Sequence, residues 1–156
     1  MLSRDTMKVH WIALLIVIGA ALTASTVSAQ VIEMNNGYIV STADDITNDT
    51  RLPAQIPLLS SIITQGETHT YSRYVSSGTA SMIADLNWGD ISDSLSLTLI
   101  APDATLGPYY DGADGQVDGR VFLRVSKSPS LTTGTWWNRI YGYQVTGSED
   151  YTFNSY

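Results

Sequence analysis

Residues 80–103 read ASMIADLNWGDISDSLSLTLIAPD, and the prediction of the fold rests first on this stretch. Apolar residues occupy every second position in both of its halves: Met82, Ala84, Leu86, Trp88, then Leu95, Leu97 and Leu99. Successive side chains of a strand point to opposite faces, so a period of two predicts two half-buried β-strands. Residues 89–93 are rich in turn formers and Pro102 ends the second run. We therefore predict a β-hairpin whose apolar face packs against the other strands.

Further strand-like runs recur along the chain at a spacing of roughly ten residues. They are rich in Val, Ile, Thr and aromatic residues, and they cover residues 37–40, 56–63, 67–75, 120–125, 135–145 and 151–153. Residues 106–119 read as a loop, because Gly, Pro, Tyr and Asp dominate them. No helical period follows residue 29. The pattern predicts an all-β fold, an antiparallel β-sandwich of seven to eight strands.

The first 29 residues have the pattern of a secretory signal peptide. Arg4 and Lys8 precede an uncharged run at residues 11–24, and small residues follow at 27–29. The run is shorter than the ~20 residues of a membrane span. An uncleaved anchor is the alternative, and only then would the protein contact a membrane. Of the two start residues Met1 and Met7, the pattern favours Met7, because a start there removes Asp5 from the basic region. We predict a signal peptide (1–29), an N-terminal spacer (30–57) that can add one edge strand, and a sandwich domain (58–156).

Charge and composition exclude some functions. Without Arg4, Lys8 and Asp5, the 8 basic and 15 acidic residues fall to six and fourteen, and the net charge moves from -7 to −8. Nucleic-acid binding is disfavoured, because it depends on basic side chains that neutralise phosphates. The chain contains no cysteine, so thiol catalysis and disulfides are excluded. The 127 residues that remain of 156 are enough for one domain with an apolar core.

Several short motifs, taken together, resemble a known family. In order they are Gly66-Glu67, Tyr71, residues 75–78, Asp93-Ser94-Leu95-Ser96-Leu97, Pro102-Asp103, Gly134-Thr135-Trp136, residues 140–143 and Tyr151-Thr152-Phe153. This order is similar to the pre-peptidase C-terminal domain of bacteria and archaea, over about residues 62–153. The resemblance implies a jelly-roll-like β-sandwich, commonly appended to secreted proteases, with some members binding calcium and some binding polymers such as collagen. This would be a free-standing copy, and Asn138 stands where the family usually carries an apolar residue.

A candidate calcium site lies in the acidic loop DGADGQVDG, residues 111–119. Calcium takes six to eight oxygen ligands in loosely constrained geometry, and Asp111, Asp114 and Asp118 would supply carboxylates. The spacing is not that of an EF-hand. The three Asp-Gly pairs also fit plain tight turns. Asp90 and Asp93 could add ligands if the loops converge.

A candidate ligand-binding surface lies on the aromatic strand at residues 135–145. If Trp136 and Ile140 face the core, alternation places four residues on the opposite face: Trp137, Arg139, Tyr141 and Tyr143. An exposed aromatic stripe suits binding of sugars or extended peptides, because flat rings give a large contact area. The alternative is that neighbouring strands or the N-terminal segment cover the stripe.

Catalysis has little support in the sequence. After residue 29 the only histidine is His69, which we expect at the surface, and no Gly-x-Ser-x-Gly motif occurs. We predict a secreted or cell-surface, non-catalytic binding module whose partner is an extracellular polymer or protein. The alternatives are a structural cell-surface subunit and a small secreted hydrolase, in which two of the many carboxylates would act as a pair.

Overall fold

The computed structural model describes residues 29–43 and 59–156, which form ten β-strands and no helix. The strands are β1 (Val31–Asn35), β2 (Tyr38–Thr42), β3 (Leu59–Thr64), β4 (Thr68–Val75), β5 (Ser81–Asn87), β6 (Ser94–Ala101), β7 (Ala104–Tyr110), β8 (Arg120–Lys127), β9 (Gly134–Gln144) and β10 (Ser148–Ser155). None of the described residues belongs to a helix that is long and apolar enough to cross a membrane.

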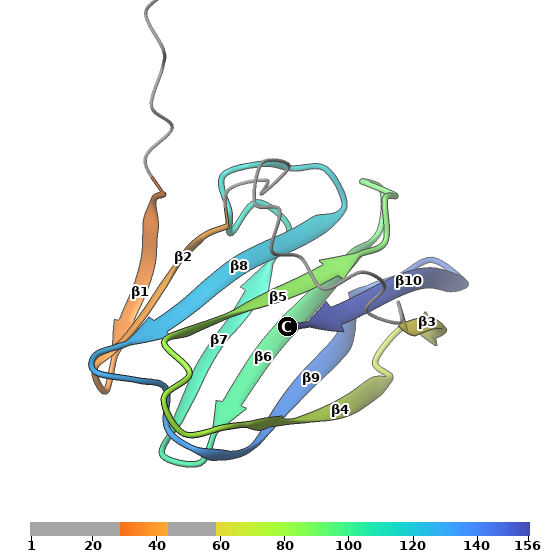
Figure 1. Ribbon diagram of the computed structural model, residues 1–156. Coiled ribbons are helices and arrows are strands. Elements are labelled where there is room, and N and C mark those ends of the chain that lie inside the picture. The colour runs from red at the N-terminus through yellow and green to blue at the C-terminus, as the bar shows by residue number, and fades with distance from the viewer. Residues whose placement is uncertain (1–28, 44–58) are drawn as a thin grey trace, which may run out of the picture.

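Two antiparallel sheets pack face to face (Figure 1). The six-stranded sheet has the order β1-β2-β8-β5-β10-β3, and the four-stranded sheet has the order β4-β9-β6-β7. The core between them is built from alternate residues of both sheets, with Leu86 and Leu123 from one and Leu97 and Trp136 from the other, all without exposed surface. The predicted all-β antiparallel sandwich is confirmed, with more strands than expected.

The predicted hairpin is wrong, although both of its strands exist. β5 pairs with β8 and β10, whereas β6 pairs with β9 and β7 in the other sheet. Residues 88–93 therefore cross from one layer to the other, and Trp88 is buried in that crossing with 6% of its surface exposed. Alternation predicts which face of a strand is buried, but two strands that share a core from opposite sides show the same pattern as two paired strands.

The described part of the expected spacer, residues 30–43, belongs to the sandwich. It forms two strands, β1 and β2, and β2 lies inside the sheet between β1 and β8 rather than at its edge. Tyr38 and Val40 have no exposed surface. The rest of that segment, and the predicted signal peptide up to residue 28, lie outside the described residues.

A polar cluster of Tyr38, Asp103, Lys127 and Thr132 connects β2 to the four-stranded sheet. The Tyr38 hydroxyl donates to Asp103 Oδ1 at 2.5 Å, and Lys127 Nζ lies 2.7 Å from Asp103 Oδ2 and 4.0 Å from the centre of the Tyr38 ring. Desolvation raises the pKa of Asp103, but the hydrogen bonds from Lys127, Tyr38 and Thr132 outweigh it and lower the pKa to about 2. The Asp103 carboxyl is therefore ionised, and in this form it connects the N-terminal hairpin to the four-stranded sheet.

The expected loop at residues 106–119 begins with a strand. Leu106 and Tyr109 of β7 face the core, but they are three positions apart because a bulge lies between them. A bulge adds one residue and breaks the period of two, so the strand was not visible as alternation. The segment after Tyr110 is irregular, as expected.

Candidate functional site

All four strongly exposed aromatic side chains of the described residues lie on the outer face of the four-stranded sheet. Tyr74 is 67% exposed, Tyr143 50%, Trp137 47% and Tyr110 38%. They come from three strands: β4, β9 and β7. Aromatic surface of this extent is costly to leave in water, so its concentration on one face makes that face the leading candidate for a binding site.

The alternation along β9 explains the position of the predicted stripe. Trp136, Asn138 and Ile140 point into the core with at most 1% exposure. The residues between them, Trp137 and Arg139, are exposed. Tyr141, the next outward residue, is half-buried, and Tyr143 continues the row. The four predicted residues therefore do share one face.

Sequence reasoning missed two members of this face, Tyr110 and Tyr74. The Tyr110 ring packs edge-on against Tyr143, with ring centres 4.7 Å apart. Ser96 lies opposite both Tyr110 and Tyr141 in the sheet, and it is only 3% exposed beside these rings. Tyr110 was not predicted because the bulge in β7 breaks the alternation. Tyr74 was not predicted because the facing of residues 67–75 is ambiguous in the sequence, where Tyr71 and Tyr74 fall on opposite faces.

Arg139 lies in the middle of the aromatic face. Its neighbours across the sheet are Thr70 on β4 and Thr98 on β6. Arg139 is exposed and forms no ion pair with any carboxylate of the described residues. The face thus offers five guanidinium N–H donors between rows of rings and hydroxyl groups.

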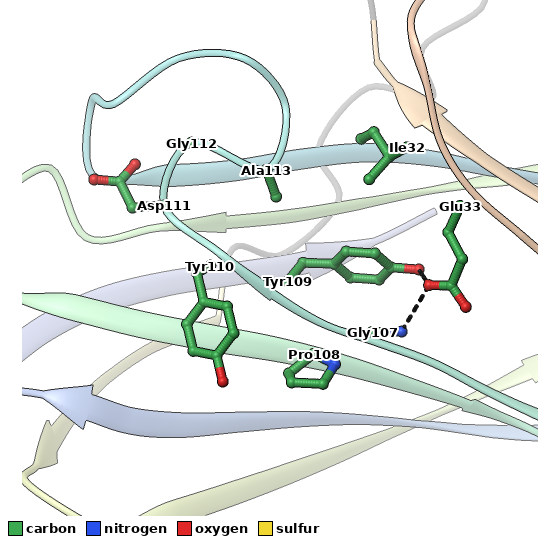
Figure 2. A pocket seen from close by; sticks show the side chains of 9 residues that line it. All are labelled: Ile32, Glu33, Gly107, Pro108, Tyr109, Tyr110, Asp111, Gly112 and Ala113. Atoms are coloured by element: carbon green, nitrogen blue, oxygen red, sulfur yellow. Dashed lines mark hydrogen bonds between the residues drawn. The ribbon is translucent and has the colours of Figure 1, made fainter.

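An open cavity of about 570 Å³ lies beside this face, between β1 and the end of β7 (Figure 2). Tyr109 points to Glu33 there, and Tyr110 points to the other side of the strand. Glu33 Oε2 accepts from the Tyr109 hydroxyl at 2.5 Å and from the Gly107 amide at 3.0 Å. Burial raises the pKa of Tyr109 and Glu33 raises it further, so the hydroxyl stays protonated and acts as a structural donor.

Two of the three predicted calcium ligands, Asp111 and Asp114, accept hydrogen bonds from backbone amides. Asp111 Oδ1 accepts from the amides of Asp118 and Gly119, and Asp114 accepts from the amides of Gln116 and Phe122. Within the described residues no three acidic or histidine side chains form a group that could hold a metal ion. Two of the aspartates therefore cap their own loop. The calcium site stays a prediction.

His69 is part of a hydrogen-bonded chain that sequence reasoning did not foresee. Its Nε2 lies 3.0 Å from Glu67 Oε1 and its Nδ1 lies 2.6 Å from the Tyr151 hydroxyl, which in turn lies 2.6 Å from the Tyr71 hydroxyl. Burial, and then Tyr71, raise the pKa of Tyr151, so this hydroxyl is a poor nucleophile. The expectation of a plain surface histidine is only partly right, because His69 links β4 to β10 across the two sheets.

A buried pair of acidic residues closes one end of the sandwich. Glu149 and Asp93 are 7% and 6% exposed, and Asp93 Oδ1 accepts from the Thr146 amide at 3.0 Å. Desolvation, and then Asp93 and Asp90, raise the pKa of Glu149 to about 7. The loop of Asp90 and Asp93 does meet the acidic loop, at Gly119, but these two carboxylates bind elsewhere.

The fold and the face define an all-β sandwich with an aromatic surface on its smaller sheet. No protein-family model and no curated protein matches the chain. The resemblance to the pre-peptidase C-terminal domain therefore stays a prediction that rests on the motifs alone.

Proposed function

We propose that this protein is a secreted, non-catalytic module that binds an extended extracellular polymer through the outer face of its four-stranded sheet. The observation that carries the proposal is the gathering of Tyr74, Tyr110, Trp137 and Tyr143 on that face, each exposed by more than a third. Trp, Tyr and Arg dominate binding energies where they are exposed before a partner arrives, and Arg139 lies among these rings.

A binding role is favoured over a hydrolase by the state of the titratable groups. His69 binds Glu67, two residues before it, and the Tyr151 hydroxyl of the other sheet. The Asp93–Glu149 pair is buried at an end of the sandwich and does not line the open cavity. The two carboxylates that do line it, Glu33 and Asp111, accept hydrogen bonds from the Tyr109 hydroxyl and from backbone amides of the chain. Acid–base catalysis requires such groups within reach of a bound substrate.

Export rests on the pattern of residues 1–29. We expect the exported protein to begin at Gln30, and the intact mass of the secreted species measures this directly. A secreted or membrane fraction that retains residues 11–24 would indicate an anchor instead.

Polymer capture tests the binding role. The parent protein, Trp137→Ala and Ile62→Ala are incubated with insoluble chitin, cellulose, collagen and peptidoglycan. Ile62 is a matched control, because it is 62% exposed but lies on β3 of the other sheet. We expect at least one polymer to retain the parent and Ile62→Ala but not Trp137→Ala. Equal retention of all three proteins would contradict the proposal, and a native mass of a dimer through this face would favour a structural subunit.

A further inference from the structure

Carboxylates are distributed very unequally between the two sheets. The six-stranded sheet contains Glu33, Asp85, Glu149 and Asp150 within its strands. The strands of the four-stranded sheet, β4, β6, β7 and β9, contain no Asp or Glu, although the whole chain has 15. Within the part of the chain that the structure describes, the aromatic face therefore belongs to a sheet whose strands carry no negative charge, in a chain of net charge -7.

Hydroxyl groups fill the space between the rings. On β4 the exposed outward residues next to Tyr74 are Thr68, Thr70 and Ser72, and on β6 Thr98 lies beside Arg139. Aliphatic side chains are few, and Ile100 is only partly exposed. The core of a protein–protein interface is more apolar than this, because its centre must lose its water.

We propose that the polymer is an uncharged polysaccharide, an assignment that rests on the binding role proposed above. A sugar ring has an apolar face of C–H groups that packs on Trp137 or a tyrosine, and a rim of hydroxyl groups. The Ser and Thr hydroxyls both donate and accept hydrogen bonds to such a rim, and Arg139 donates from the middle of the face. From Trp137 to Tyr143 the strand spans roughly 20 Å at about 3.4 Å per residue, so the face suits several consecutive sugar units.

Charge excludes the two charged classes of polymer. A polyanion would meet one cation, Arg139, on a molecule of net charge -7. A polycation would find no carboxylate on the face, since the nearest ones lie in loops at the ends of the strands, at Glu67, Asp93, Asp103 and Asp111. An extended peptide would instead pair with a free strand edge such as that of β4, because its affinity comes from main-chain hydrogen bonds.

Native gel electrophoresis in soluble polymers tests the assignment. With a pI of about 4.4 the protein migrates toward the anode, and a polymer that binds it slows this migration. The neutral polymers are hydroxyethyl cellulose, xyloglucan and galactomannan. Carboxymethyl cellulose is the anionic counterpart of hydroxyethyl cellulose. The proteins are the parent, Trp137→Ala, Tyr143→Ala and the control Ile62→Ala, each checked for folding by its melting temperature. A gelatin gel provides the peptide arm.

We expect at least one neutral polysaccharide to slow the parent and Ile62→Ala equally, and the affinity of Trp137→Ala to fall at least about tenfold. Carboxymethyl cellulose should bind more weakly than hydroxyethyl cellulose. Equal or tighter binding of the anionic polymer would overturn the assignment. If gelatin alone slows the parent, and Trp137→Ala is not slowed, the polysaccharide assignment is overturned but the polymer-binding role still stands. If Trp137→Ala behaves as the parent in every gel, both proposals fail.

Discussion

Two consecutive tryptophans show how sharply the environment changes from one residue to the next. Trp136 has no exposed surface, and its ring packs edge-on against Tyr38 with centres 5.4 Å apart. Trp137 is 47% exposed on the other side of the same strand. Because side chains alternate across a strand, one strand supplies both a core residue and an exposed residue of the proposed binding face.

Trp88 should be essential for stability. It is 6% exposed, and its indole N–H donates to the Asp93 carbonyl at 3.2 Å. We expect Trp88→Ala to lower the free energy of unfolding by about 3–5 kcal/mol, because the cavity can collapse only in part. Urea unfolding followed by circular dichroism measures this. A loss below about 1 kcal/mol, typical of surface sites, would mean that Trp88 is not core.

Glu149 should make stability fall as the pH rises. Its pKa is about 7 in the folded protein against 4.5 for the ordinary side chain, so the folded state holds the proton more tightly. The stabilisation is complete below pH 4.5 and is lost as the pH rises through about 7. We expect Glu149→Gln to be less pH-dependent over this window and more stable than the parent at pH 8.

The control for Glu149 is Asp118→Asn, which changes an exposed carboxylate in the loop between β7 and β8. Melting temperatures between pH 4.5 and 8 should follow the parent for this control. If Glu149→Gln also follows the parent, Glu149 ionises normally and the buried pair does not influence stability.

At this scale the sequence predicts burial well and polar partners poorly. Alternation placed Trp88 in the core and put Trp136 and Ile140 on one shared face, and all three are buried. The surroundings of Glu149 and His69 were not predicted, because their partners Asp93 and Tyr151 lie 56 (149 − 93) and 82 positions away and only the packed sheets bring them near. The signal for Tyr74 was present, because Tyr74 shares a face with Ser72 and Val75 lies on the other face, but Tyr71 on the face opposite to Tyr74 made the facing ambiguous.

Among the elements, β9 shows how a single position controls sheet packing. A Cβ atom at Gly142 would lie 2.3 Å from the Thr64 carbonyl oxygen of β3, in the other sheet. A backbone oxygen cannot yield as the end of a side chain does. Only glycine therefore lets β9 pass the end of β3 at this distance.

We expect Gly142→Ala to cost about 3 kcal/mol, the upper range for overpacking. Gly147→Ala is the comparison, because its φ of +76° is strained for alanine but nothing lies near the added carbon. That strain costs about 1 kcal/mol. Denaturant unfolding should rank the two variants in this order, and the reverse order would place the tight contact elsewhere.

The pairing of the elements was less predictable than their existence. β5 and β6 were recognised as strands but were assigned to one hairpin, and they belong to different sheets. The choice depends on strands far along the chain, since β8 and β10 take the positions beside β5. β1 was not predicted, because its five residues show no alternation. A bulge between Val31 and Glu33 interrupts the period of two.

For the whole molecule, the charge pattern distinguishes the two sheets. Among the described residues, the carboxylates lie in the strands of the six-stranded sheet and in the loops, whereas the outer face of the four-stranded sheet presents rings, hydroxyls and one arginine, Arg139. The aromatic stripe was predictable from β9 alone, but the breadth of the face needed β4 and β7 beside it.

The central claim is that this aromatic face is open for binding and does not hold the fold together. Denaturant unfolding of Trp137→Ala beside the parent tests it most directly. We expect the free energy of unfolding to change by less than about 1 kcal/mol, because Trp137 lies outside the core. A loss of about 3–5 kcal/mol, as expected for Trp88→Ala, would show that the stripe is buried packing and would contradict the claim.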